Sequence, residues 1–255
     1  MAIDIQKKYL IEFNNVSFSY EKEKELFQNI SFKIPENSIT GICGLNGVGK
    51  STILKLLLGI YTNYQGDILI KNKNLKEISK KERSLLFSYL GIIEDVHFQL
   101  AVLDLVKMGR YPYTNFWGFL TKADSEIINA ALKEMDLFDI KNSFVNALSS
   151  GEKQRVHLAR AIVQQTNVLL LDEPFAHLDL FHTQKMINLL KKKFIDQKTN
   201  IILISHDLNL VSHFCNYGIL ITKQGSVITI DPKQLFDKKI MKEVFNLDAY
   251  HWRDL

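Results

Sequence analysis

A glycine-rich segment, Gly44–Ser51, constrains the fold of this chain more than any other feature. Its residues, GLNGVGKS, fit the pattern GxxxxGK[ST]. The segment Ser38–Cys43 before it predicts a short buried strand, and Ser51–Leu58 after it carries apolar residues at the i, i+4 spacing of a helix face. These segments predict a strand, a loop and a helix, which is the structural context that the pattern requires.

The chemistry of such a loop is phosphate binding. Glycines let backbone N–H groups close around phosphate oxygens, and the N-terminus of the following helix adds a favourable dipole. In this pattern Lys50 reaches the β- and γ-phosphates of a nucleotide, and Ser51 ligates Mg²⁺. A chance glycine loop is the alternative, and the flanking strand and helix disfavour it. The expected nucleotide-binding residues are Gly44, Asn46, Gly47, Gly49, Lys50, Ser51 and Thr52.

An acidic pair follows a second predicted strand. Val168–Leu171 is a continuous apolar run, and Asp172 and Glu173 come directly after it. Ligands of α/β proteins bind at the carboxyl ends of parallel strands, so both side chains are expected at the ligand edge of the sheet. We predict that Asp172 holds Mg²⁺ through its water shell and that Glu173 polarises the attacking water. An acidic pair without a ligand, at a strand end on the surface, is the alternative.

His206 follows a third apolar run, Asn200–Ile204, and is therefore expected at the same carboxyl edge. An imidazole can donate a hydrogen bond to a phosphate oxygen. We predict that His206 contacts the γ-phosphate; the alternative is a structural or solvated histidine.

The rest of the chain predicts an α/β fold with a mostly parallel core sheet. A helix over Thr183–Phe194, between the second and third apolar runs, completes a βαβ pattern. Three β-like segments predict an antiparallel layer, and residues from about 102 to 160 are predicted to be helical without a strand. The β-like segments are Leu10–Phe18, Ile30–Ile34 and Gly66–Ile70.

Composition limits the class of protein. The chain has 255 residues, 46% hydrophobic and 24% charged, with a mean hydropathy of −0.04, which is sufficient for a buried core. Its apolar runs are shorter than the roughly 20 residues that span a bilayer, and its first residues lack the apolar core of a secretory signal. Cys43 and Cys215 show no zinc spacing and are predicted to be buried, reduced thiols.

No linker composition divides the chain, so we expect one domain over residues 1–255. Its core is expected to comprise residues of about 1–90 and 161–255, with a helical sub-domain of about 91–160. The net charge of +4 is spread along the chain and does not predict a nucleic-acid groove.

One motif distinguishes among proteins that carry a phosphate-binding loop. Leu148–Glu152 reads LSSGE and precedes a predicted helix over Lys153–Gln164, so Ser149–Gly151 are expected at a helix N-terminus. Alone, this sequence would predict only a helix cap. Combined with the preceding motifs, and in this order along the chain, it resembles the LSGGQ signature of ATP-binding-cassette (ABC) ATPases.

The resemblance covers nearly the whole chain. Tyr20 matches the aromatic residue that stacks on adenine in that family, and Ala176–Asp179 matches the loop after the catalytic glutamate. The family implies a head-to-tail homodimer that binds ATP and Mg²⁺. Each ATP would lie between the phosphate-binding loop of one copy and the signature of the other, where Ser149, Ser150 and Gly151 cap the γ-phosphate.

The chain departs from the family pattern in two places. In the signature, Ser150 replaces the usual Gly and Glu152 the usual Gln, and both variants occur in active members. The family also places a Gln that touches Mg²⁺ and the transmembrane partner after the strand near residue 90, where this chain has none. We expect Glu94 to replace it as a metal ligand, or Gln99 if the strand ends late; alternatively Glu94 is solvated and the coupling contact lies between residues 97 and 113.

Within the family, Ala101–Tyr113, which contains the sequence GRYP, resembles importers of iron siderophores, haem and cobalamin. This implies two transmembrane permease subunits, indirectly a substrate-binding protein, and a peripheral location on the cytoplasmic face of the cell membrane. A soluble cassette protein acting on nucleic acid or ribosomes is the main alternative, and no nucleic-acid partner is expected. A P-loop kinase for small molecules would leave the signature unexplained.

Overall fold

The computed structural model describes residues 8–20, 25–91, 99–114 and 118–246, and their contacts divide the chain into two compact units. The first unit combines Met1–Arg83 with Asn200–Leu255, and the second is Ser84–Thr199. Helix α2, Lys80–Leu86, contains the boundary between them. The sub-domain limits near residues 90 and 160 stay a prediction.

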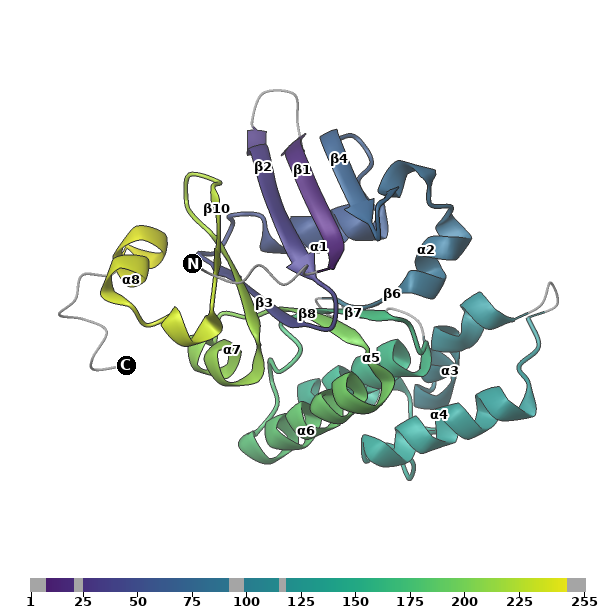
Figure 1. Ribbon diagram of the computed structural model, residues 1–255. Coiled ribbons are helices and arrows are strands. Elements are labelled where there is room, and N and C mark those ends of the chain that lie inside the picture. The colour runs from purple at the N-terminus through teal and green to yellow at the C-terminus, as the bar shows by residue number, and fades with distance from the viewer. Residues whose placement is uncertain (1–7, 21–24, 92–98, 115–117, 247–255) are drawn as a thin grey trace. The chain divides into compact units, whose positions relative to one another are not determined.

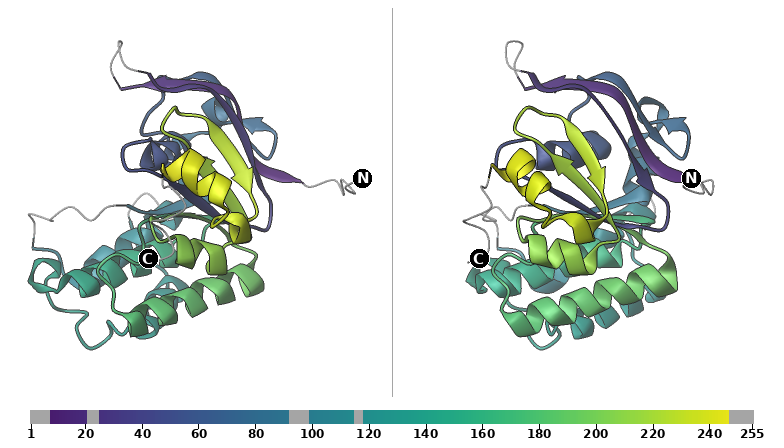
Figure 2. Two further views of the ribbon diagram at one scale, coloured as in Figure 1. Left: turned by 90° about the vertical axis from the view of Figure 1, so that its left-hand side faces the viewer. Right: turned by 60° about the vertical axis from the view of Figure 1, so that its left-hand side comes forward.

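An antiparallel sheet belongs to the first unit, with strand order β2-β1-β4-β5. Figure 1 shows β2, β1 and β4 side by side in purple and blue. Phe13 of β1 pairs with Phe32 of β2, and their rings stack with centroids 4.4 Å apart. The pairing changes register between Phe13 and Val16, and Figure 2 shows that both strands bend. The strands are β1 (Tyr9–Ser19), β2 (Glu25–Pro35), β4 (Gln65–Ile70) and β5 (Lys73–Asn74).

Parallel strands form the other layer of the first unit. Strand β3, Ile39–Gly44, lies between β8, Asn200–Ile204, and β9, Tyr217–Ile221, and pairs in parallel with both. Every residue of β3 and β8 is buried, as predicted for a short buried strand and for a continuous apolar run, respectively. Strand β10, Val227–Ile230, adds an antiparallel edge to β9.

Three helices of the first unit accompany these strands: α1 (Lys50–Leu58), α7 (Leu208–Phe214) and α8 (Lys238–Phe245). The Arg83 guanidinium lies at the end of α1, where it donates to the carbonyl oxygen of Leu58 at 3.4 Å and to that of Leu75 at 3.0 Å. The bond to Leu58 satisfies a carbonyl that the last turn of a helix leaves without an intrahelical donor.

The second unit contains two parallel strands and a group of helices, teal and green in Figure 1. Val156, Ala159 and Val163, one face of the predicted helix in α5, are all fully buried. Between residues 102 and 160 the described residues include no named strand, as expected. The elements are β6 (Phe87–Leu90), β7 (Val168–Asp172), α3 (Val102–Lys107), α4 (Lys122–Glu134), α5 (Ser150–Val163) and α6 (Leu180–Gln197).

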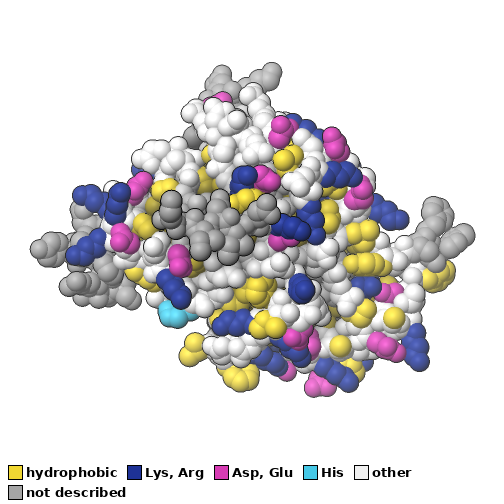
Figure 3. Space-filling view, viewed as in Figure 1, with side chains coloured by type: hydrophobic (Ala, Val, Ile, Leu, Met, Phe, Trp, Pro, Cys, Tyr) yellow, Lys and Arg dark blue, Asp and Glu magenta, His cyan; other side chains and the backbone are white. Residues whose placement is uncertain are grey.

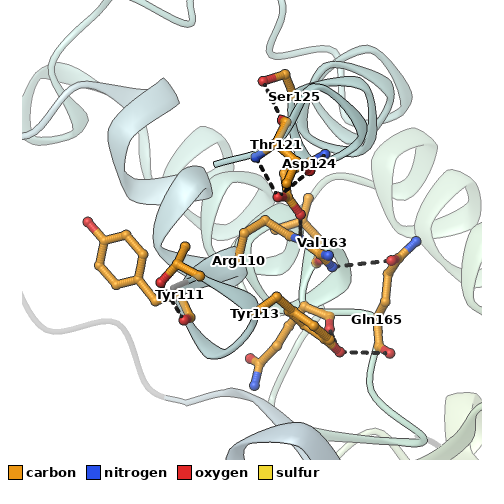
Figure 4. Close-up of polar contacts among 10 residues, drawn as sticks. Arg110, Tyr111, Tyr113, Thr121, Asp124, Ser125, Val163 and Gln165 are labelled. Carbon is orange, nitrogen blue, oxygen red and sulfur yellow. Dashed lines mark hydrogen bonds and ion pairs between the residues drawn. The ribbon is translucent and has the colours of Figure 1, made fainter. Parts of the chain in front are cut away.

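A buried ion pair joins three of these helical segments (Figure 4). Arg110, in the short 3-10 helix Met108–Tyr113, donates through Nε to Asp124 Oδ1 of α4 at 2.7 Å. Its Nη1 donates to the Val163 carbonyl oxygen at the end of α5 at 2.8 Å. Both charged side chains are buried, and such a pair is costly to break because the remaining charge would lack its partner.

The start of α4 completes this cluster. The backbone N–H and hydroxyl of Thr121 donate to Asp124 Oδ2 at 2.8 and 2.7 Å. These bonds, followed by the Arg110 charge, hold the pKa of Asp124 below its usual range. The carboxylate therefore stays ionised although it is buried.

His157 on α5 makes the free energy of unfolding depend on pH. Its side chain is 9% exposed, and among the described residues its Nε2 has no hydrogen-bond partner. Burial, and then the charge of Arg160, lower the pKa of His157 to about 4. The folded protein therefore binds fewer protons than the unfolded chain between about pH 4 and 6.5, so the free energy of unfolding falls as the pH drops through this window.

We expect His157→Phe to remove this dependence. In the parental protein, the contribution of His157 should lower the free energy of unfolding by about 3 kcal/mol near pH 4, since 1 pKa unit corresponds to about 1.4 kcal/mol. Urea unfolding at a series of pH values measures it. The same slope between pH 6.5 and 4 in parental and variant proteins would contradict the assignment to His157.

The structure confirms the predicted α/β class with parallel strands, an antiparallel sheet and helices. Cys43 and Cys215 are buried and free, as predicted. The predicted helix over residues 183–194 is longer, because the Asp179 side chain accepts the His182 N–H and starts α6 at Leu180. Among the described residues, no helix is both long and apolar enough to cross a membrane.

Candidate active site

The predicted phosphate-binding loop lies between the last residue of β3 and the first residue of α1 in the first unit. Gly44 and Gly49 have φ values of +153° and +101°, which residues with a Cβ rarely adopt. A Cβ on Gly44 would also lie 2.4 Å from the carbonyl oxygen of Ile221. Backbone geometry and crowding by β9 therefore require glycine at the start of the loop.

Lys50 begins α1, and its side chain turns back over the loop. The residue is only 8% exposed, and Nζ donates to the carbonyl oxygens of Gly44 and Leu45 at 2.9 Å each. Because these acceptors belong to the loop itself, the ammonium charge lies at the loop, where a phosphate group would be bound. This placement favours the predicted role of Lys50.

Tyr20 lies directly after β1 and reaches the start of α1, where its hydroxyl forms a hydrogen bond with the Thr52 hydroxyl. Its ring is edge-on to those of Phe18 and Tyr61, with centroids 5.2 and 5.4 Å away. Tyr20 is nevertheless 55% exposed, so its ring retains surface for stacking. The adenine contact stays a prediction, and the structure brings Tyr20 to the helix that follows the loop.

His206 lies at the same sheet edge as the phosphate-binding loop. Ile42 of β3 pairs with Ile204 of β8, and Gly44 and His206 each follow two residues later. The histidine is exposed, so its imidazole is accessible to a ligand. The structure thus places Gly44–Thr52, Tyr20 and His206 in one unit.

The acidic pair belongs to the second unit. Asp172 is the last residue of β7 and is buried, and Glu173 follows it with a left-handed backbone, φ +50°. Burial, together with the negative charge of Asp172, raises the pKa of Tyr89 to about 12. A fixed carboxylate at the strand end, followed by a residue in a sparsely populated conformation, is typical of a functional turn.

The signature residues begin α5 in the second unit. The Ser149 hydroxyl accepts the Glu152 N–H at 3.3 Å, and Glu152 Oε2 accepts the Ser149 N–H at 2.9 Å, so the two residues form a capping box. The Ser149 hydroxyl and N–H lower the pKa of Glu152. Ser150 and Gly151 therefore lie in the first turn, as predicted, and an ionised Glu152 lies beside them.

Glu94 lies outside the described residues, so its metal-ligand role stays a prediction, while Gln99 is described and exposed. Gln154, which the sequence did not single out, donates to the backbone of Glu173 and Pro174. No sequence pattern marks this contact, because its acceptors are carbonyl groups.

A glycine loop between a buried strand and a helix, with its lysine over the loop, defines a P-loop nucleotide-binding protein. The model of the ABC transporter family matches residues 27–176. The chain belongs to this family, and it is an ATP-binding subunit that hydrolyses ATP.

Several relatives share most of their length with this chain. The iron(3+)-hydroxamate import ATP-binding protein FhuC of Bacillus subtilis (strain 168) is 34% identical over 228 residues, covering 89% of this chain and 84% of the relative. The petrobactin import ATP-binding protein YclP of the same organism is 31% identical, covering 93% of both. A solved metal-chelate type ABC transporter in an inward-facing conformation is similar with a TM-score of 0.79 and 27% identity, covering 94% of this chain and 90% of that one.

Proposed function

We propose that this chain powers the import of ferric siderophores or similar metal chelates. Two copies would form the head-to-tail dimer and join two permease subunits at the cytoplasmic face of the membrane, with a substrate-binding protein acting outside. Relatives that import iron(3+)-hydroxamate and petrobactin support this substrate class. The observation that carries the ATPase step is the folded phosphate-binding loop with the Lys50 ammonium directed onto it.

The proposed site combines residues of this chain with the signature residues of a partner copy. The loop N–H groups and Lys50 bind the β- and γ-phosphates, and the Tyr20 ring stacks on adenine. The hydroxyl of Ser51 and the carboxylate of Asp172 are oxygen donors of the kind that Mg²⁺ prefers, and Glu94 is the further proposed ligand. Bound Mg²⁺ neutralises charge that develops on the phosphate oxygens.

Hydrolysis then follows from the remaining side chains. Glu173 accepts a proton from the attacking water, whose oxygen forms a bond to the γ-phosphorus while the bond to the β-phosphate oxygen breaks. His206 donates to a γ-phosphate oxygen and stabilises the charge there. The partner's signature residues, at the N-terminus of α5, cap the same phosphate group through their N–H groups.

The alternative, a soluble cassette protein acting on nucleic acid, predicts a continuous basic surface. On the face shown in Figure 3, blue and magenta side chains alternate over the described residues. Such mixed charge is typical of a solvated protein surface, and this face shows no continuous basic surface over the described residues.

We expect the tagged chain to co-purify with two permease subunits from detergent-solubilised membranes of its source cells. Their presence should raise its rate of ATP hydrolysis, because coupled subunits respond to the conformation of the permease. Co-sedimentation with ribosomes from the same lysate is the parallel measurement. Recovery with ribosomes and without permeases would overturn the transport proposal in favour of the soluble alternative.

A further inference from the structure

The first turns of the signature helix are hydrogen-bonded to the loop that carries the predicted catalytic carboxylate. Gln154 of α5 is 4% exposed, and its Nε2 donates to the Pro174 carbonyl oxygen at 2.8 Å and to the Glu173 carbonyl oxygen at 3.2 Å. An amide NH₂ group has two hydrogens to donate, and both are used here. The bonds lie within the second unit and join residues 19 and 20 positions apart in sequence.

The acceptor of the longer bond belongs to a residue in an unusual conformation. Glu173 has φ +50°, in the left-handed region that a residue with a Cβ adopts only when its surroundings hold it there. Its carbonyl oxygen also accepts the Ala176 N–H at 3.2 Å. Gln154 is thus a side chain from outside this turn that contacts the Glu173 backbone.

A second contact brings the same two segments together. A Cβ on Gly151, in the first turn of α5, would lie 3.0 Å from the His177 carbonyl oxygen, so the backbones approach closely at this point. The turn after β7 therefore contacts α5 at Gly151 and at Gln154, within one turn of the helix. A shift of the turn after β7 would therefore displace the start of α5, and the reverse, because closely packed segments do not move independently.

We propose that Gln154 is a positioning residue that fixes Glu173 relative to the signature and so couples the two ATP sites of the dimer. This inference rests on the proposed head-to-tail dimer, in which the signature serves the partner's ATP while Glu173 serves the ATP on its own chain. One amide therefore joins groups that belong to different sites. Occupation of one site is transmitted to the carboxylate of the other, and by linkage the binding free energies respond reciprocally.

The chain offers a matched control on the same helix. Gln164, at the other end of α5, donates through Nε2 to the carbonyl oxygens of Ser84 and Phe87 at 2.6 and 3.0 Å. Gln154→Leu and Gln164→Leu each remove two such bonds from one helix, so both should lower Tm. Only the Gln154 variant removes the contact with the turn after β7, which carries Glu173.

We expect Gln154→Leu, in the reconstituted transporter, to lower kcat by about tenfold or more, since small misplacements of a catalytic group are costly. The Hill coefficient for ATP should fall towards about 1 as the sites lose their coupling. The dissociation constant for a fluorescent ATP analogue at the first site to be filled should stay within about twofold, because the P-loop is intact. Gln154→Asn keeps the amide on a shorter side chain and should cause the same loss without removing a polar group.

Parental kcat and Hill coefficient in both Gln154 variants would overturn the inference, and so would an equal loss of kcat in Gln164→Leu. Loss of kcat and cooperativity in the Gln154 variants alone would support it. A separate experiment tests the proposed ATPase mechanism. Hydrolysis of ATP at the parental rate by Glu173→Gln would overturn that mechanism independently of the role of Gln154.

Discussion

Glu173→Gln is expected to lower ATP turnover by about a hundredfold or more while ATP binding is retained, as for loss of a general base. The amide has nearly the same shape as the carboxylate but does not accept the proton of the attacking water. Because binding is retained and hydrolysis is blocked, the variant should accumulate as a dimer with ATP between its copies. Turnover is measured by phosphate release, and the dimer by gel filtration with and without ATP.

Lys50→Ala is the control for this experiment. It removes the ammonium group that lies over the P-loop, so it should weaken nucleotide binding itself and form no ATP-dependent dimer. Binding of a fluorescent nucleotide separates the two variants. Parental turnover in Glu173→Gln would show that another group activates the water.

A mixture of Lys50→Ala and Gly151→Asp chains is expected to recover activity that neither variant shows alone. In a head-to-tail dimer, the mixed pair places both lesions in one site and leaves the other site complete. With random pairing, half of the dimers are mixed and each keeps one site, so about a quarter of parental turnover should return if one site acts alone. Phosphate release from the separate and the mixed proteins measures it.

The head-to-tail arrangement of the two chains can also be tested directly by cross-linking. A cross-link between Ser149 and a nucleotide bound to the P-loop of the same chain would contradict the head-to-tail arrangement. A cross-link that appears only between differently tagged chains would agree with it. Each chain's own signature would then act on the ATP of its partner.

The local context of the P-loop was predictable because an apolar strand, three glycines and an amphipathic helix follow one another without interruption. The cap of α5 was predictable for the same reason, since Ser149 and Glu152 are three residues apart and form a capping box by themselves. Such features depend on neighbours in sequence, and the structure confirms them.

Other elements depend on partners that the sequence does not reveal. Strand β10 exists by pairing with β9, and its four residues alone do not distinguish a strand from a loop. The start of α6 at Leu180 depends on the N-cap Asp179, which the sequence pattern places only in the loop after the predicted catalytic glutamate. Contacts from Tyr20 to Thr52 and from Gln154 to Pro174 join distant segments, and no spacing rule predicts them.

The Arg110 cluster has a practical consequence for labelling. The chain leaves the cluster at Tyr113, whose hydroxyl donates to the Gln164 carbonyl oxygen at 2.7 Å, and re-enters it at Thr121. Both ends of this connection are thus fixed independently of what lies between them. Lengthening a loop with fixed ends costs only about 0.6 kcal/mol for each doubling. A peptide tag inserted between Gly118 and Phe119 would therefore label the helical segments. The Arg110–Asp124 ion pair that joins them would stay in place.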